Sequence, residues 1–287
     1  MERLPVTIEP VRTPHAALVM GVVNVTPDSF SDGGRFFDPA AALTHARQLI
    51  AEGADLLDVG GESTRPGAAP VSVEEEIARV VPLVRALRAE TAAPISVDTM
   101  KPQVARAAVA AGATIWNDVT ALRHAPESLA VAAELGCEVV LMHMQGEPQT
   151  MQAEPRYDDV VAEVAAFLEA RAEAAVAAGV ARERIWLDPG IGFGKQMIRH
   201  NLPLIAALDR IVALGFPVLL GVSRKRFIGA LDQDAAPDQR LGGSIAAALA
   251  GVAAGAAAVR VHDVRETVQA LRVWQAIVEA RPACRRT

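Results

Sequence analysis

The sequence is poor in aromatic residues and in cysteine. Aromatic side chains make up 4% of the 287 residues, whereas hydrophobic residues as a whole make up 51%. The core therefore has to be built from aliphatic side chains, such as those that fill the interior of a barrel in layers. The two cysteines, Cys137 and Cys284, exclude a disulfide framework and fit a reducing, cytoplasmic setting.

Long apolar runs and an excess of one charge are also missing. The formal net charge is −6, with acidic and basic residues mixed along the chain, so we expect no nucleic-acid or membrane partner. The most apolar stretch, residues 244–259, is rich in alanine and glycine. We interpret it as a buried helix that runs into a strand. Glu2, Arg3 and Pro5 near the start do not fit a signal peptide.

Short apolar runs alternate with alanine-rich stretches in which apolar residues recur at i, i+3 and i+4, the spacing of an amphipathic helix. Proline marks the expected first turn of three helices, at Pro39, Pro102 and Pro126. The expected strands are 17–25, 56–60, 95–98, 114–118, 138–143, 185–188, 218–222 and 257–261. The expected helices are 39–52, 73–91, 102–111, 126–135, 158–178, 202–214, 243–253 and 265–280.

Strict alternation of strands and helices predicts a parallel sheet with right-handed crossovers. An open doubly wound sheet and a closed barrel both fit this pattern. Eight units that each end in a polar residue favour closure, because an open sheet uses only the strand ends near its switch point. We therefore predict an α/β fold, a single (β/α)8 TIM barrel over residues 1–287, with an N-terminal extension at 1–15 and a flexible tail at 281–287.

Three connections are longer than a barrel requires. Residues 26–38 follow the first strand and residues 61–72 follow the second, and both are rich in Gly, Ser, Asp and Pro. Long loops in a compact domain are usually either functional or disordered, and we interpret these two as lids over the site. The third, residues 145–157, carries two prolines and no clear periodicity, and the sequence suggests no role for it.

Polar residues at the strand ends form the candidate site, because the carboxyl ends of barrel strands share one face. Carboxylate and amide groups can pair with the donors and acceptors of a flat heterocycle, with a lysine opposite them. Arginine and histidine suit phosphate oxygens, and an asparagine oxygen can complete the shell of a hard cation. The strand-end residues are Asn24, Asp58, Asp98, Asn117, His143, Asp188, Ser223 with Lys225, and Arg260 with His262.

Several of these residues also have a purely structural interpretation. Asp98 can cap the helix that follows it, and Asn117 with Asp118 can form a turn. His262 and Asp263 can form a hydrogen-bonded pair. Residues 192–195 lack the spacing of a phosphate-binding P-loop.

The basic run and the remaining histidines also have purely structural interpretations. Lys225 lies between Arg224 and Arg226, and such a run is more often a solvated face. We expect His143, which stands between two methionines, to be packed rather than to bind metal. The other histidines lack ligand spacing, and we expect them on the surface: His15, His45, His124 and His200.

The motifs resemble those of the dihydropteroate synthase family, in order, from residue 20 to residue 264. Two are long and specific: residues 20–34, MGVVNVTPDSFSDGG, and residues 58–67, DVGGESTRPG. Shorter matches follow at 96–99 (SVDT), 117–118 (ND), 142–146 (MHMQG), 188–195 (DPGIGFGK), 223–225 (SRK) and 260–264 (RVHDV). Residues 196–200 are less typical of the family, but they lie beyond the pocket motifs.

The resemblance implies that p-aminobenzoate is joined to 6-hydroxymethyl-dihydropterin pyrophosphate, which gives dihydropteroate and pyrophosphate in folate biosynthesis. It implies Mg²⁺ as cofactor, a homodimer formed through residues 244–254 and 265–280, and competition by sulfonamides at the p-aminobenzoate site. The implied pterin ligands are Thr64, Asp98, Asn117, Met142, Asp188 and Lys225. The implied pyrophosphate ligands are Asn24, Arg65, Arg260 and His262, with magnesium near Asn24. Pro66, Phe193 and Ser223 are implied at the p-aminobenzoate site, and Asp32, Arg65 and Lys225 in catalysis.

The expected chemistry is a dissociative substitution. Cations neutralise the departing pyrophosphate, and the pterin delocalises the positive charge left on the methylene carbon. The arylamine then attacks without an activated serine, cysteine or lysine nucleophile. Asp32 and Arg65, one on each long loop, are expected to meet when the loops close over the site.

Two rival functions remain. A pterin-dependent methyltransferase barrel has similar Asp and Asn strand ends, but it has no use for the loop at residues 63–66 or for Arg260 and His262. A silent binding protein is expected to have lost a ligand contact, whereas every matched position is filled. The motifs therefore favour the synthase.

Overall fold

The computed structural model describes residues 17–25, 39–63, 68–147 and 150–280. Its strands are β1 (Leu18–Asn24), β2 (Leu56–Gly60), β3 (Ile95–Asp98), β4 (Ile115–Asp118), β5 (Glu138–Met142), β6 (Ile185–Asp188), β7 (Leu219–Gly221) and β8 (Ala258–Val261). Its α-helices are α1 (Pro39–Glu52), α2 (Val73–Glu90), α3 (Pro102–Ala110), α4 (Ser128–Leu135), α5 (Val160–Ala177), α6 (Asn201–Ala206), α7 (Leu208–Val212), α8 (Arg226–Leu231), α9 (Leu241–Ala253) and α10 (Val264–Glu279). Two short 3₁₀ turns, η1 (Arg182–Arg184) and η2 (Pro237–Gln239), complete the described elements.

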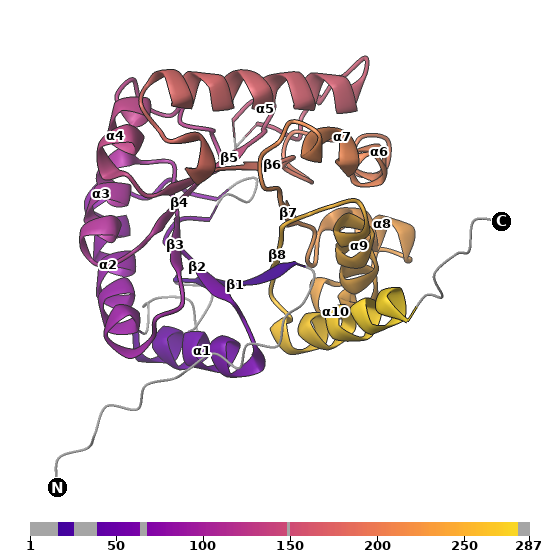
Figure 1. Cartoon of the computed structure of the whole chain (residues 1–287), viewed down its shortest axis with the longest axis horizontal. Helices are drawn as coiled ribbons and strands as arrows, with labels where there is room; N and C mark the ends of the chain where they lie inside the picture. Colours follow the sequence, from indigo (N-terminus) through magenta and orange to yellow (C-terminus); the bar gives the residue numbers. More distant parts are fainter. Residues whose placement is uncertain (1–16, 26–38, 64–67, 148–149, 281–287) are drawn as a thin grey trace, which may run out of the picture.

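The strands form the predicted closed barrel. All of the strand pairs are parallel, in the order β6-β5-β4-β3-β2-β1-β8-β7. A parallel bridge between Leu187 and Val218 joins β6 to the chain just before β7 and closes the ring. Figure 1 shows the ring of strands inside a ring of helices. The TIM-barrel prediction is confirmed, and the open doubly wound sheet is excluded.

Alternation along each strand divides the core into two parts. Outward residues such as Val19, Val23 and Leu57 belong to a large aliphatic cluster between the strands and the helices. Inward residues near the amino ends form a smaller apolar plug inside the barrel. Side chains along a strand alternate with a period of two. On several strands, the inward residue that follows the plug residue therefore lies at the carboxyl end of the strand. The plug consists of Met20, Leu56, Ile115, Val140, Leu219 and Ala258, with Trp186 packed against it.

The helices follow the predicted pattern with three differences. The expected helix 202–214 is divided into α6 and α7, because Ala207 between them leaves the helical conformation (φ −111°, ψ 30°). Helix α4 begins at Ser128, so Pro126 precedes the helix instead of lying in its first turn. Helix α8 was not predicted, because a helix of 6 residues is too short to show a periodic apolar pattern.

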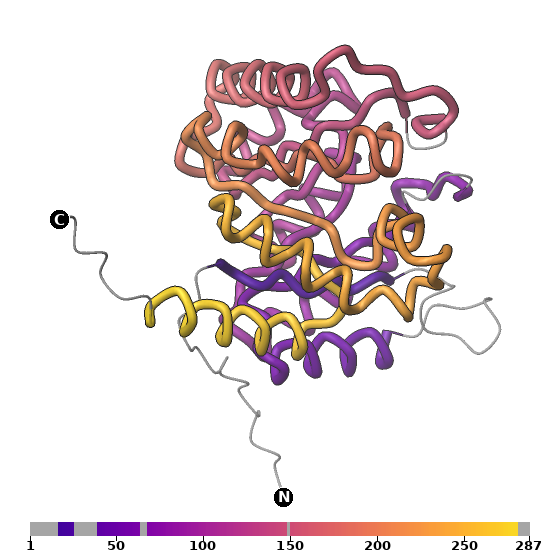
Figure 2. Tube along the Cα trace, turned by 90° about the vertical axis from the view of Figure 1, so that its right-hand side faces the viewer, coloured from indigo at the N-terminus to yellow at the C-terminus, as the bar shows by residue number. Residues whose placement is uncertain are grey.

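The last helix and the first helix complete the outer ring. Figures 1 and 2 show α10 beside α1, and both helices contact β1. Among the described helices, none is both long enough and apolar enough to cross a membrane. The predicted domain limits remain a prediction, because the extension at 1–15, the tail at 281–287 and the loop at 26–38 lie outside the described residues.

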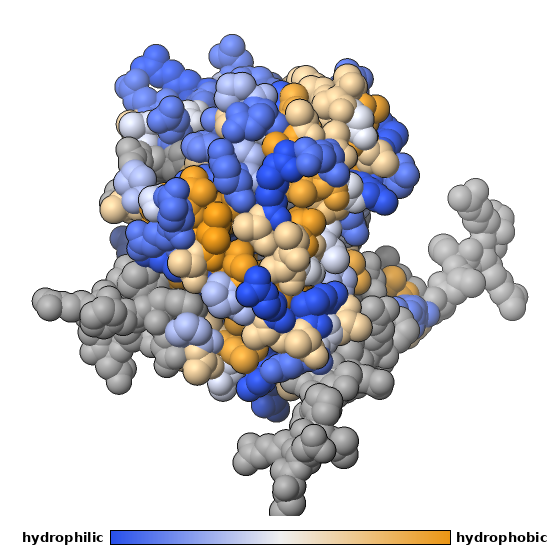
Figure 3. Space-filling view, turned by 90° about the vertical axis from the view of Figure 1, so that its left-hand side faces the viewer, coloured by the Kyte–Doolittle hydropathy of each residue, from blue (hydrophilic) through white to orange (hydrophobic). Residues whose placement is uncertain are grey.

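The helical face made by α2, α3 and α4 mixes hydrophilic and hydrophobic residues (Figure 3). Exposed ion pairs link neighbouring helices around the ring, with Arg47 of α1 bound to Glu90 of α2, and Arg106 of α3 bound to Glu134 of α4. Exposed pairs of this kind contribute little to stability, because water and salt screen their charges. Stability therefore comes mainly from the aliphatic layer beneath the helices.

Leu168 and Val176 on α5 test this conclusion. Leu168 is fully buried in the layer between helix and sheet, whereas Val176 is 40% exposed. We expect Leu168→Ala to lower the free energy of unfolding by about 2–5 kcal/mol, as measured by urea denaturation. Val176→Ala should change it by less than about 0.5 kcal/mol. Equal effects of the two substitutions would contradict the described packing.

Candidate active site

The register of the strands places several predicted residues in one row at the mouth of the barrel. Asn24 of β1 lies level with Gly60 of β2, Gly60 with Asp98 of β3, and Asp98 with Asn117 of β4. A Cβ atom at Gly60 would stand 3.5 Å from the Cβ atom of Asp98. The glycine therefore leaves open the space beside the carboxylate.

Arg260 of β8 joins two carboxylates across this mouth. Its Nε donates to Asp58 Oδ2 at 2.6 Å, and its Nη2 donates to Asp98 Oδ2 at 2.9 Å. Asn117 Nδ2 also donates to Asp58 Oδ2, at 3.2 Å. Asp58 is fully buried, and its Oδ1 has no hydrogen-bond partner among the described residues. The network ties β2, β3, β4 and β8 together around one guanidinium.

One cation between two carboxylates leaves this cluster with an excess of negative charge. Burial and the Asp58 carboxylate raise the pKa of Asp98 to about 7, although Arg260 opposes the shift. Burial alone would lower the pKa of Arg260, but the two aspartates raise it above its ordinary value. The guanidinium therefore stays charged, and Asp98 takes up a proton near neutral pH.

A second pair of ionisable residues, Asp188 and Lys225, lies across the mouth, at or just beyond the ends of β6 and β7. Asp188 Oδ1 accepts a hydrogen bond from Gly190 N at 2.7 Å, and burial raises the pKa of this carboxyl. Burial lowers the pKa of Lys225 to about 8, and the charge of Asp188 partly offsets that effect. The Lys225 Nζ lies 4.3 Å from the ring centroid of Phe193, a cation–π distance.

Ser223 and His262 pair between the ends of β7 and β8. The Ser223 Oγ lies 3.0 Å from His262 Nδ1 and accepts a hydrogen bond from His262 N at 3.1 Å. Burial, reinforced by the charge of Arg260, lowers the pKa of His262 to about 3. The imidazole is therefore neutral at pH 7, and its Nδ1 pairs with Ser223.

The sequence left purely structural roles open for four residues, and the structure shows which contacts they make: Asp98, Asp118, His262 and Lys225. Asp98 bonds to Arg260 instead of capping α3, which begins after Lys101. It is Asp118 that forms a turn, since its carboxylate accepts from the backbone of Thr120 and Leu122.

The alternative pairing of His262 with Asp263 is not the one that the structure shows, because Asp263 binds Arg224 and His262 pairs with Ser223. The basic run at 224–226 is not a uniformly solvated face. Arg224 turns to Asp263, Lys225 lies over Phe193, and only Arg226 is exposed.

A cluster of flexible apolar side chains forms one wall of the mouth. Met142, at the end of β5 and level with Asp188, belongs to this cluster, and Phe193 packs against it. Methionine adapts its shape to neighbouring groups, which suits a surface against a flat ring. The cluster consists of Val119, Met142, Met144 and Met151, with Met100 and Phe193 packed against it.

His143 is packed as predicted, but its main partner was not foreseen. Its Nδ1 lies 2.9 Å from the Nζ of Lys195, which is 1% exposed, and its ring packs edge-on against Phe167. The prediction that His200 lies on the surface is wrong. His200 is buried, accepts a hydrogen bond from Gln196 N at 3.1 Å, and packs edge-on against Tyr157.

Four predicted site residues lie outside the described residues: Asp32, Thr64, Arg65 and Pro66. The other predicted site residues stand at or beside the carboxyl ends of the strands, as expected. Asp58 was noted as a strand-end residue without a role, although the alternation along β2 places it on the inward face. The burial of Lys195 and Asn201 gave no signal in the sequence, because both lie in loops or at a loop–helix boundary.

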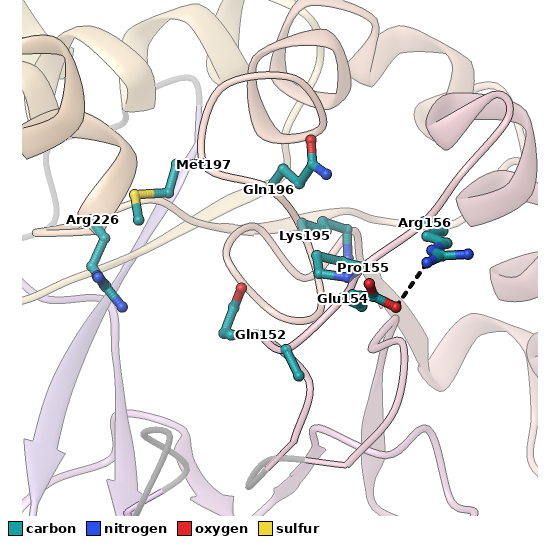
Figure 4. A pocket seen from close by; sticks show the side chains of 9 residues that line it. Gln152, Glu154, Pro155, Arg156, Lys195, Gln196, Met197 and Arg226 are labelled. Carbon is teal, nitrogen blue, oxygen red and sulfur yellow. Dashed lines mark hydrogen bonds and ion pairs between the residues drawn. The ribbon is translucent and has the colours of Figure 1, made fainter.

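The rim of the mouth is hollowed between the segment after β5 and the loop after β6. This open hollow has a volume of about 530 Å³ and includes Gln152, Lys195 and Arg226. Figure 4 shows Gln152 on the first segment, near Lys195 on the second, with Arg226 across the hollow. Asp98, Asp188 and Lys225 are not among the residues that line this hollow, so we place the chemistry at the strand ends.

The curated relatives share most of the chain. A family model described as pterin binding enzyme matches residues 20–262. The dihydropteroate synthase of Escherichia coli strain K12 is 50% identical over 263 residues, which cover 92% of each protein. The dihydropteroate synthase of Neisseria meningitidis serogroup B is 53% identical over 266 residues, which cover 90% of this chain and 92% of the relative.

Solved structures share the fold as well. The dihydropteroate synthase of Xanthomonas albilineans with 4-aminobenzoic acid matches at a TM-score of 0.86 and 56% identity, covering 93% of this chain and 94% of that one. The structure from the same organism in complex with 7,8-dihydropteroate matches at 0.83 and 53% identity, covering 93% and 95%. The Yersinia pestis enzyme in a sulfonamide drug complex matches at 0.86 and 45% identity, covering 92% and 95%.

The barrel is closed, Arg260 pairs with Asp58 and Asp98 at its mouth, and Asp188 and Lys225 lie at the same end. Together with the match over residues 20–262, these features define a pterin-binding enzyme. The relatives described above are dihydropteroate synthases. The chain belongs to the dihydropteroate synthase family. The resemblance that the motifs indicated is confirmed.

Proposed function

We propose that this chain condenses 6-hydroxymethyl-7,8-dihydropterin pyrophosphate with p-aminobenzoate to form 7,8-dihydropteroate and pyrophosphate. The observation that carries the proposal is the shared mouth, where Asp98 and Asn117 stand on one side and Asp188 and Lys225 on the other. Relatives of 56% and 53% identity have been solved with 4-aminobenzoic acid and with 7,8-dihydropteroate.

The pterin ring is assigned to the space between these two groups. Its N–H donors face the carboxylate oxygens of Asp98 and Asp188, its acceptors face Asn117 and Lys225, and Met142 packs on its face. These carboxylates are buried, and buried carboxylates need donors or cations to offset the loss of hydration. The Asp58 carboxylate keeps Arg260 and Asn117 in place. Thr64 is assigned to the same substrate from its position in the motif.

The leaving group is assigned to the cationic side of the mouth. Asn24, Arg65, Arg260 and the neutral His262 bind the pyrophosphate oxygens. The C–O bond breaks with its electron pair going to pyrophosphate, and the carboxylates stabilise the cation left on the methylene carbon.

The arylamine nitrogen then forms the C–N bond and loses one proton to solvent. Phe193, Ser223 and Pro66 hold the arylamine, and sulfonamides compete there. Asp32 and Arg65 close over the reacting groups from the two long loops, a step that excludes water.

Magnesium is proposed as the cofactor, held near Asn24. Asn24 is half-buried at the end of β1, in the same row as Asp98. No group of three or more His, Cys, Asp or Glu residues in the described part of the chain can hold a metal ion. The protein therefore fits an ion that takes most of its ligands from pyrophosphate and water, as Mg²⁺ commonly does. Bound there, the ion would neutralise charge on the leaving group.

We also propose a cytoplasmic homodimer. Apolar side chains stand exposed on α8 and α10, where Leu231 is 61%, Val273 56% and Ile277 63% exposed. Burying these side chains against a second copy would remove apolar area from water. The cytoplasmic location is supported by the low cysteine content, with Cys137 free and buried.

A pyrophosphate-release assay tests the proposed reaction. We expect pyrophosphate and dihydropteroate in equal amounts only when both substrates are present, and a large loss of rate with excess chelator that added Mg²⁺ restores. A protein that releases no pyrophosphate from the two substrates would refute the proposal. Full activity in excess chelator would refute the magnesium assignment alone.

The pH dependence tests the roles of Asp98 and Lys225. The kcat/KM for the pterin substrate should rise through pH about 7, as Asp98 ionises, and fall through pH about 8, as Lys225 loses its proton. Arginine keeps its charge up to about pH 12, so Lys225→Arg should abolish the alkaline limb while retaining some activity. Lys225→Ala should lower kcat/KM by about 10- to 100-fold. An alkaline limb that persists in Lys225→Arg would show that another group causes it.

A further inference from the structure

The glycine-rich loop after β6 is held in place by side chains from outside it. This loop, residues 190–194, carries the partly buried Phe193. Gly192 (φ +84°) and Gly194 (φ +59°) have the left-handed backbone that glycine adopts freely. Glycine also loses the most conformational freedom on folding. A loop of this composition holds an aromatic ring in one position only if other groups fix its backbone.

Each carbonyl from Gly192 to Gly194 accepts a hydrogen bond from a different side chain. Gln152 Nε2 donates to Gly192 O. Lys195 Nζ donates to Phe193 O at 3.0 Å, and Tyr157 OH donates to Gly194 O at 2.8 Å. These three donors form what we call the carbonyl brace: Gln152, Tyr157 and Lys195.

Two further contacts complete the restraint. Asn201 Oδ1 accepts from Gly192 N at 2.8 Å, and Lys195 Nζ is also bound to the ring and the carbonyl of His143. The side chain of Asn201 further donates to the carbonyls of Gln196 and Met197. The segment after Lys195 is therefore connected to the loop through Asn201.

Two members of the brace come from residues 145–157, the long connection for which the sequence suggested no role. Gln145 joins the two ends of this segment, since its side chain donates to Arg156 O at 2.8 Å and accepts from Arg156 N at 2.9 Å. A Cβ atom at Gly194 would lie only 2.3 Å from Gln145 O. The segment thus packs directly against the loop and presents Gln152 and Tyr157 to it.

We propose that Gln152 and Tyr157, together with Lys195, are positioning residues that hold Phe193 against Lys225 and thereby set the affinity for the arylamine substrate. The inference rests on the proposed function. It assigns the segment at 145–157 to the p-aminobenzoate side of the site, because Phe193 lies between the brace and Lys225. The side-chain hydrogen bonds of Gln152 and Tyr157 go to the carbonyls of the loop, whereas the pterin side of the mouth is formed by strand ends.

Tyr157→Phe tests the inference, because it removes one hydroxyl and keeps the ring between His143 and His200. We expect the KM for p-aminobenzoate to rise by about 3- to 10-fold, the effect of one lost hydrogen bond. The KM for the pterin substrate and kcat should change by less than about twofold. Gln152→Met should also raise the KM for p-aminobenzoate, and the double variant should raise it more than either single variant does.

Thr91→Val is the matched control. It also removes one buried hydroxyl, which accepts from Ala93 N at 3.0 Å before β3, at the amino end of the barrel. It should leave the KM for p-aminobenzoate unchanged. Hydrogen exchange of the backbone in residues 190–194 should accelerate in Tyr157→Phe and not in Thr91→Val.

An unchanged KM for p-aminobenzoate in both brace variants would overturn the inference, as would an equal rise in the KM of both substrates. Unchanged hydrogen exchange in Tyr157→Phe would also overturn it. The wild-type assay decides the proposed function, and the comparison among variants decides this inference, so the two can fail separately.

Discussion

The Arg260 guanidinium holds the mouth of this barrel together. It bonds to Asp58 and Asp98, which stand on two neighbouring strands, while its own strand pairs with β1 and β7. Breaking such a buried network by removing one member leaves a charge without a partner, at a cost of about 3–5 kcal/mol. Burial raises the pKa of Asp98, and this network adjusts the shift, because the second carboxylate raises the pKa further and the guanidinium lowers it.

The two sides of the mouth are built in different ways. On the pterin side, the reacting groups lie on strands, and backbone register fixes Asp98 beside Asn117 and Met142 beside Asp188. On the arylamine side, Phe193 lies on a loop whose backbone is fixed by side chains. Strands hold side chains more accurately than loops do. Substitutions of residues that do not contact a substrate are therefore expected to change substrate affinity mainly on the loop side of the mouth.

The sequence predicted each strand to within one residue and placed the polar residues at one end of the barrel. This part was predictable because an alternating apolar pattern with turn residues at its ends is local information. The pairing of Arg260 with Asp58, 202 residues apart, was not predictable, since it depends on the closure of the barrel between β1 and β8.

Loop contacts escaped prediction for a similar reason. The roles of Gln152 and Tyr157 depend on how one loop packs on another, and no periodic pattern encodes that. His200 was placed on the surface because it lacks the spacing of a metal ligand, yet it is buried and packs against Tyr157. Helix α8 was missed because it is short, and the expected helix at 202–214 contains a local break at Ala207 that its apolar pattern does not reveal.

The central claim is that the strand ends and the loop after β6 form one binding site for both halves of the product. The most direct measurement is a crystal structure of this protein with 7,8-dihydropteroate bound. The account predicts the pterin within hydrogen-bond distance, about 3.2 Å, of Asn117, Asp188 and Lys225, with the arylamine ring beside Phe193. Product bound elsewhere, with those strand-end side chains more than about 4 Å from it, would contradict the account.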